Sequence, residues 1–143
     1  MSTIIIDASV GLKWFVPEVH SLEAHYWRGP SHELHTLAVF FEIEIANVLW
    51  KKVQRAQLTF PEAAQIAMEF PALALQRHAE SSLIPSALDL AQQINRTVYD
   101  SLYLALAVQL NGRMVTADLR LHNSISATAF AKHIAWIADI SPP

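Results

Sequence analysis

Short apolar runs rich in β-branched residues alternate with longer helical patterns along this chain, and that alternation constrains the fold more than any other feature. Such alternation is typical of an α/β protein with a parallel sheet covered by helices on both faces. We expect about five short strands, at residues 3–6, 35–39, 73–77, 113–117 and 134–137.

The helical patterns separate these strands. A capping box, Thr59 with Glu62, marks the start of one helix and has Pro61 in its first turn. We found no linker, repeat or low-complexity segment, so we expect one domain over residues 1–143, with a tail at 141–143. The expected helices span residues 10–15, 18–28, 40–55, 59–70, 84–95, 99–110 and 119–130.

Composition removes several chemistries. The chain has no cysteine, which excludes disulfides, thiolate nucleophiles and sulfur-based zinc sites. Its three glycines lie far apart, so no glycine-rich phosphate loop can be written. A hydrophobic fraction of 52% implies a large core, or a core with a subunit interface.

Net charge and hydropathy limit the partners and the cellular location that the chain can have. A net charge of −3 provides no broad basic field for duplex nucleic acid, although a local basic rim could still hold a strand. The apolar start at 4–6 is too short for a signal peptide, and no stretch reaches the roughly 18 apolar residues of a membrane helix. We therefore expect a cytoplasmic protein without a membrane partner.

Four of the thirteen acidic residues stand out by position. Asp7 and Asp118 each follow a predicted strand and open a helix, so both would lie at the carboxyl edge of the sheet, where ligands bind. Each could instead be a simple helix N-cap. Asp100 opens an apolar helix, where a partly buried carboxylate needs a base or a metal as partner.

The fourth acidic residue is a glutamate, and helical geometry alone does not decide between Glu42 and Glu44. Glu42 and Glu44 lie about 200° apart on the helix, so one can face solvent while the other faces inward. Carboxylates that converge without cysteine suit a hard divalent cation, Mg²⁺ or Mn²⁺. Such ions serve phosphoryl chemistry by activating water and neutralising phosphate charge.

Four segments align in order with one family. They are residues 5–10 (IIDASV), 44–50 (EIANVLW), 98–105 (VYDSLYLA) and 115–118 (VTAD). With these motifs the chain resembles a PIN-domain protein, specifically a VapC-type ribonuclease toxin of a type II toxin–antitoxin system. Each motif alone is weak, whereas four in series are specific.

The resemblance implies a PIN-like three-layer α/β/α fold and an Mg²⁺- or Mn²⁺-dependent endoribonuclease that hydrolyses RNA phosphodiester bonds with metal-activated water. Carried over by motif, the catalytic metal ligands are Asp7, Glu44, Asp100 and Asp118, which selects Glu44 over Glu42. Ser9 and Thr116 match small hydroxyl positions near the metal. The resemblance also implies a VapB-type antitoxin partner and a homodimer.

The sequence departs from the family at Ala38, where many relatives have proline, and at Glu42, which could modulate the site. Lys13, Arg96 and Arg120 could contact RNA phosphates, although solvated surface is the commoner role of such residues. We expect His32 and His35 to be surface residues rather than metal ligands.

Two other functions stay open. One is a non-catalytic PIN-fold module that binds RNA or a partner. The other is an aspartyl-phosphate phosphotransferase on a similar sheet, which usually has an Asp pair or a DxD motif that residues 7–9 (DAS) lack.

Overall fold

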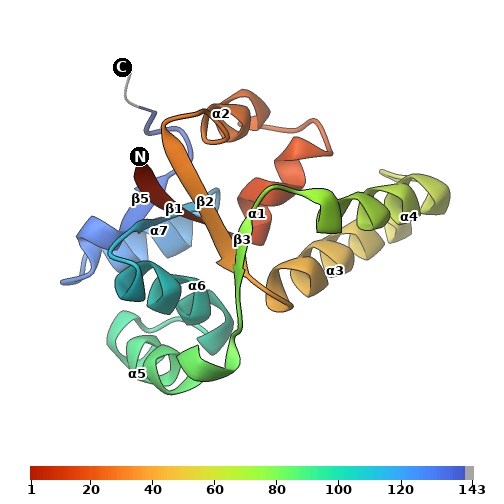
Figure 1. The fold of residues 1–143 in the computed structure, drawn as a ribbon. Helices are drawn as coiled ribbons and strands as arrows, with labels where there is room; N and C mark the ends of the chain where they lie inside the picture. Colours follow the sequence, from red (N-terminus) through yellow and green to blue (C-terminus); the bar gives the residue numbers. More distant parts are fainter. Residues whose placement is uncertain (141–143) are drawn as a thin grey trace.

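Five strands form one parallel sheet in the computed structural model, which describes residues 1–140 (Figure 1). All neighbouring strands are parallel, and their order is β3-β2-β1-β4-β5. This confirms the predicted sheet. The strands are β1 (Ser2–Ile6), β2 (His32–Leu37), β3 (Gln76–His78), β4 (Arg113–Thr116) and β5 (Ile134–Trp136).

Helices cover the sheet and complete the predicted three layers. α6 packs against β1, β2 and β4, and α5 packs on α6, while α3 and α4 form a hairpin that extends to one side (Figure 1). The helices are α1 (Ala8–Gly11), α2 (Ser21–Tyr26), α3 (Phe40–Gln54), α4 (Phe60–Glu69), α5 (Ile84–Ile94), α6 (Val98–Gln109) and α7 (Leu119–Ser126). Short 3₁₀ turns lie at Leu12–Trp14, Phe70–Ala72, Ser81–Leu83 and Ala131–His133.

Element boundaries differ from the prediction where distant contacts decide them. β2 begins at His32 rather than 35, because Ser2 and Thr3 of β1 pair with His32 and Glu33 and draw polar residues into the sheet. α7 ends at Ser126 rather than 130, and Thr128 Oγ1 donates a hydrogen bond to the Ile125 carbonyl there, at 2.6 Å. The predicted tail at 141–143 lies outside the described residues.

The core lies on both faces of the central strands. Ile4, Ile5 and Ile6 of β1 are fully buried, as a strand covered on both faces requires. α6 is the most deeply buried helix, and every residue from Ser101 to Ala107 is buried. A helix surrounded in this way needs an apolar sequence all round, which explains its composition.

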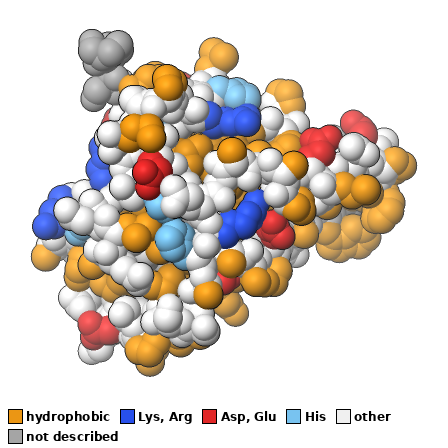
Figure 2. All heavy atoms as spheres, in the orientation of Figure 1, with side chains coloured by type: hydrophobic (Ala, Val, Ile, Leu, Met, Phe, Trp, Pro, Cys, Tyr) orange, Lys and Arg blue, Asp and Glu red, His pale blue; other side chains and the backbone are white. Residues whose placement is uncertain are grey.

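Part of the apolar content remains on the surface. Large side chains are exposed on the α3–α4 hairpin, among them Trp50, Phe60 and Met68, and Figure 2 shows hydrophobic side chains gathered over that hairpin. A groove of about 200 Å³ runs between the two helices. Among the described residues, no helix combines the length and the apolar character needed to span a membrane.

Candidate functional site

Two predicted site residues follow adjacent strands. Asp7 comes directly after β1, and Asp118 lies two residues beyond the end of β4. β1 and β4 are hydrogen-bonded neighbours, with Ile6 opposite Val115, so both acids lie at the carboxyl edge. Each is also a helix N-cap: Asp7 accepts from the Val10 N–H at 3.1 Å, and Asp118 accepts from the N–H groups of Arg120 and Leu121.

Two hydroxyl groups connect these strand ends. The Ser9 hydroxyl donates to Asp7 Oδ1 at 2.6 Å and accepts from the Ala117 N–H at 3.0 Å. Thr116 Oγ1 accepts from the Asp118 N–H at 3.1 Å and lies 3.5 Å from Ser9 Oγ. Ser9 and Thr116 therefore hold the two acid-bearing turns against each other.

Asp100 occupies the first turn of α6, after the N-cap Thr97. Its side chain is partly buried and has a basic partner, as the sequence argument required. Arg96 Nη2 lies 3.5 Å from Asp100 Oδ2 and 3.4 Å from Asp118 Oδ2. One guanidinium thus joins an acid of α6 to the acid that follows β4.

α3 contributes Glu44, which Tyr103 of α6 contacts through its hydroxyl at 2.6 Å. Glu42 points elsewhere and pairs with Arg77 of β3 at 2.9 Å. The two glutamates therefore separate as helical geometry allows, and Glu44 is the one near the other acids.

The electrostatics of these carboxylates are coupled. Burial raises the pKa of Asp7 to about 6, against hydrogen bonds from Ser9, Thr116 and Val10, and the Asp100 charge raises it further. Burial likewise raises the pKa of Glu44 to about 7; the Tyr103 hydrogen bond opposes this, and the charges of Asp7 and Asp100 add to it.

Asp100 completes the coupling. Burial raises its pKa, the Arg96 charge opposes that shift, and the Asp118 charge reinforces it. Each of the four acids therefore either shifts the pKa of another or has its own pKa shifted by one, although they come from four segments of the chain.

The donor set suits a hard divalent cation by its chemistry, since carboxylate oxygens are its preferred ligands and mutual repulsion among them is relieved by positive charge. As the side chains stand, however, no three His, Asp or Glu groups among residues 1–140 converge closely enough to hold a metal ion. Arg96 occupies part of the space between two of the acids.

Sequence reasoning missed two supporting residues. Tyr103 lies three residues after Asp100, on the same side of α6, and this spacing could have identified it. Glu80 has no local sequence signal, but its Oε2 accepts from the N–H groups of Val39, at 2.8 Å, and Phe40 at the start of α3. No local pattern links Glu80 to a helix forty residues earlier.

The expectation that His35 lies at the surface was wrong. Its side chain is 4% exposed, and its two ring nitrogens contact His78 Nε2 at 2.8 Å and Glu33 Oε1 at 2.6 Å. This chain of polar groups ties β3 to β2 rather than joining the four acids.

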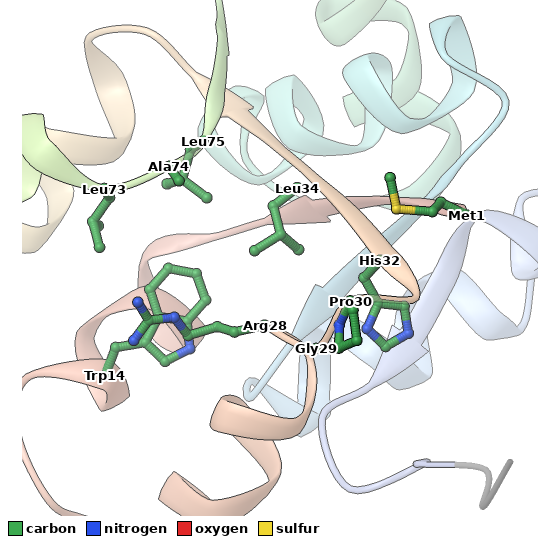
Figure 3. A pocket seen from close by; sticks show the side chains of 10 residues that line it. All are labelled: Met1, Trp14, Arg28, Gly29, Pro30, His32, Leu34, Leu73, Ala74 and Leu75. Carbon is green, nitrogen blue, oxygen red and sulfur yellow. The ribbon is translucent and has the colours of Figure 1, made fainter.

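A separate hollow of about 330 Å³ lies near the amino ends of β1 and β2, beside Met1, His32 and Leu34 (Figure 3). The Arg28 guanidinium lies over the Trp14 ring there, 4.9 Å from its centroid. None of the four acids lines this hollow, so the chemistry of the carboxyl edge does not use it.

Known proteins resemble this chain in sequence and in fold. The chain is 34% identical over 126 residues to Ribonuclease VapC3 from Pyrobaculum aerophilum, covering 87% of this chain and 95% of that protein. The crystal structure of PAE2754 from Pyrobaculum aerophilum is similar, with a TM-score of 0.67, 23% identity, and coverage of 95% of this chain and 84% of that one.

A toxin–antitoxin complex from Klebsiella pneumoniae has the same fold, with a TM-score of 0.65 and 12% identity over 96% of this chain and 99% of that one. Residues 4–126 match the PIN domain, and this span includes all four acids. The chain belongs to the PIN domain family.

Proposed function

We propose that this protein is a metal-dependent endoribonuclease and the toxin of a VapBC-type toxin–antitoxin pair. The observation that carries the proposal is the coupling of Asp7, Glu44 and Asp100, with Asp118, at the carboxyl edge of the sheet. The similarity to a protein named Ribonuclease VapC3 supports RNA as the substrate. That one PIN domain fills residues 1–143 is part of the proposal.

Asp7, Glu44, Asp100 and Asp118 are the residues that would hold Mg²⁺ or Mn²⁺. When bound, such an ion supplies positive charge to the phosphodiester and makes water acidic enough to attack phosphorus near neutral pH. Without that charge, an all-carboxylate pocket repels an RNA phosphate, so the proposal requires the ion.

The remaining residues orient the acids. Ser9 directs a hydroxyl at Asp7, and Tyr103 directs one at Glu44. Thr116 fixes the backbone at Asp118. Orientation of ligand oxygens by surrounding donors is how proteins tune metal sites.

The partners in the proposal are a VapB-type antitoxin and a second copy of the chain, in the cytoplasm. The structural similarity to a toxin–antitoxin complex from Klebsiella pneumoniae supports the antitoxin partner. The exposed apolar side chains of the α3–α4 hairpin are consistent with a surface that another protein covers.

The proposal is tested by mapping cleavage of total RNA by the purified protein with Mg²⁺ and with EDTA. Asp7→Asn and Asp100→Asn should each lower the cleavage rate by at least about a hundredfold, as loss of a metal-site carboxylate does. Asp89→Asn is the matched control, because the Asp89 side chain is exposed on α5 and accepts a hydrogen bond from Gln93. Metal-dependent cleavage by either site variant at the wild-type rate would refute the assignment.

Two further measurements, Mn²⁺ calorimetry and trapping of a phosphorylated protein, address the other functions. A non-catalytic module would give no cleavage and no Mn²⁺ binding in calorimetry. A phosphotransferase would give a phosphoaspartate at Asp7 that can be trapped and sequenced.

A further inference from the structure

Arg96 is the one Lys or Arg that pairs with any of the four acids in the described residues, and it contacts two of them. Its Nη2 lies 3.5 Å from Asp100 Oδ2 and 3.4 Å from Asp118 Oδ2. Its side chain is 25% exposed, against 27% for Asp100 and 46% for Asp118. The guanidinium is therefore partly exposed, as are the two acids that it contacts.

The backbone holds Arg96 in place. Asn95 ends α5 in the left-handed conformation, with φ 54°, and Thr97 begins α6 as its N-cap. The Arg96 N–H donates to the Ala91 carbonyl. With caps on both sides, the backbone has little freedom to carry the side chain away, so any movement of the guanidinium comes from side-chain rotation.

There is space for such rotation. An open hollow of about 480 Å³ is lined by Asn95, Arg96 and Thr97. Arg96 itself lines this hollow, so its side chain has unfilled space beside it. A planar guanidinium with paired N–H donors binds either a carboxylate or a phosphate, so the same group fits both surroundings.

We infer that Arg96 is an exchangeable cation of the site: it pairs Asp100 with Asp118 in the metal-free protein, competes with the divalent cation for them, and turns to the RNA phosphate once the ion is bound. The inference rests on the proposed function. Its physical basis is that two cations cannot share the same two carboxylates without repulsion, whereas the phosphodiester adds the negative charge that the displaced guanidinium needs.

Two variants test the inference by Mn²⁺ calorimetry on the whole chain. Arg96→Gln should bind Mn²⁺ about threefold to tenfold more tightly than wild type, as removal of two partly exposed competing ion pairs predicts. Arg120→Gln is the matched control: it removes the same charge next to Asp118, but the Arg120 side chain makes no ion pair with the acids. Its Kd for Mn²⁺ should stay within about twofold of wild type.

RNA cleavage at saturating Mn²⁺ provides the second readout. Arg96→Gln should raise KM about threefold to tenfold with a smaller change in kcat, because a phosphate contact is lost. The KM of Arg96→Lys should lie between those of wild type and Arg96→Gln, since lysine keeps the positive charge but lacks the paired N–H donors of the guanidinium. A merely structural role would not tighten metal binding while weakening RNA binding.

The results of these measurements distinguish a failure of the inference about Arg96 from a failure of the proposed ribonuclease function. If Arg96→Gln binds Mn²⁺ no more tightly than wild type, Arg96 does not compete with the ion. If the KM of Arg96→Gln equals that of wild type, Arg96 does not contact the RNA phosphate. In both cases, metal-dependent RNA cleavage by the wild-type protein leaves the proposed function intact. If neither wild type nor Arg96→Gln binds Mn²⁺, both fall together. Thermal unfolding of each variant shows that the chain remains folded during these measurements.

Discussion

At the scale of single residues, the site depends on hydrogen bonds that orient charged groups inside the fold. Tyr103 is 2% exposed and donates to Glu44, so its hydroxyl has no water to replace that partner. Asp7 is 6% exposed and relies on Ser9 and the Val10 N–H. Removal of one partner in such a pair leaves the other buried and unsatisfied.

Tyr103→Phe is therefore expected to lower the free energy of unfolding by about 1–2 kcal/mol at pH 8. Urea unfolding measures this change. Tyr99→Phe is the control, because Tyr99 lies on the same helix, is 61% exposed, and contacts Phe40 through its ring. An equal loss in both variants would show that the Glu44 contact contributes nothing.

The pKa of Asp7 predicts how the free energy of unfolding depends on pH when no metal is present. Its folded pKa of about 6 exceeds the unfolded value near 3.9, so folding favours the protonated form. Protonated Asp7 therefore adds about 2–3 kcal/mol to the free energy of unfolding. This stabilisation is fully present below about pH 4 and is lost as the pH rises through about 6.

Urea unfolding in EDTA, at pH 5 and pH 8, checks this prediction. Asp7→Asn should remove that part of the pH dependence, because the amide does not titrate, whereas Asp89→Asn should retain it. An unchanged difference between the two pH values in Asp7→Asn would contradict the assignment.

At the scale of elements, the site depends on how closely α1 approaches α3. Gly11 ends α1 with ordinary helical φ of −59°, so its role is spatial rather than conformational. A Cβ at this position would lie 2.6 Å from Cζ of Phe41, whose side chain is fully buried on α3. The absence of a side chain at residue 11 lets the helix that carries Glu44 pack against the turn after Asp7.

Gly11→Ala should lower the free energy of unfolding by about 1–2 kcal/mol, because overpacking outweighs the gain of roughly 1 kcal/mol in helix propensity. The Phe41→Leu background should reduce the cost of Gly11→Ala, since the smaller side chain leaves room. Denaturant unfolding of the four proteins in this cycle measures the coupling. Stabilisation by Gly11→Ala alone would show that the contact is not restrictive.

At the scale of the whole molecule, four segments bring like charges to one edge, and a divalent cation should stabilise the fold by relieving their repulsion. At a Mn²⁺ concentration 100 times its Kd, the gain is about 2.7 kcal/mol. This corresponds to a Tm increase of roughly 5–12 °C.

Thermal unfolding with Mn²⁺ and with EDTA checks this increase. Asp100→Asn should lose most of it, while Asp89→Asn should keep it. A wild-type Tm that does not respond to Mn²⁺ would count against the metal site.

The sequence predicted the order of strands and helices along the chain better than it predicted the boundaries of these elements. Asp7 and Asp118 could be placed because each directly follows a strand pattern, and strand ends of a parallel sheet meet at one edge. β2 extends to His32 because of its pairing with β1, a contact about thirty residues away that no local pattern encodes. Glu80 was missed for the same reason, since it caps α3 across the chain.

By itself, then, the sequence determined the α/β class and the order of strands and helices along the chain, because periodicity is a local property. The resemblance of its motifs to the PIN-domain family is what predicted the four acids. Only the tertiary structure decided which side chains support those acids: Tyr103 beside Glu44, Ser9 between two strand ends, and Arg96 between Asp100 and Asp118. Those contacts join residues that are distant along the chain, and their energies depend on burial and distance, which exist only once the chain is folded.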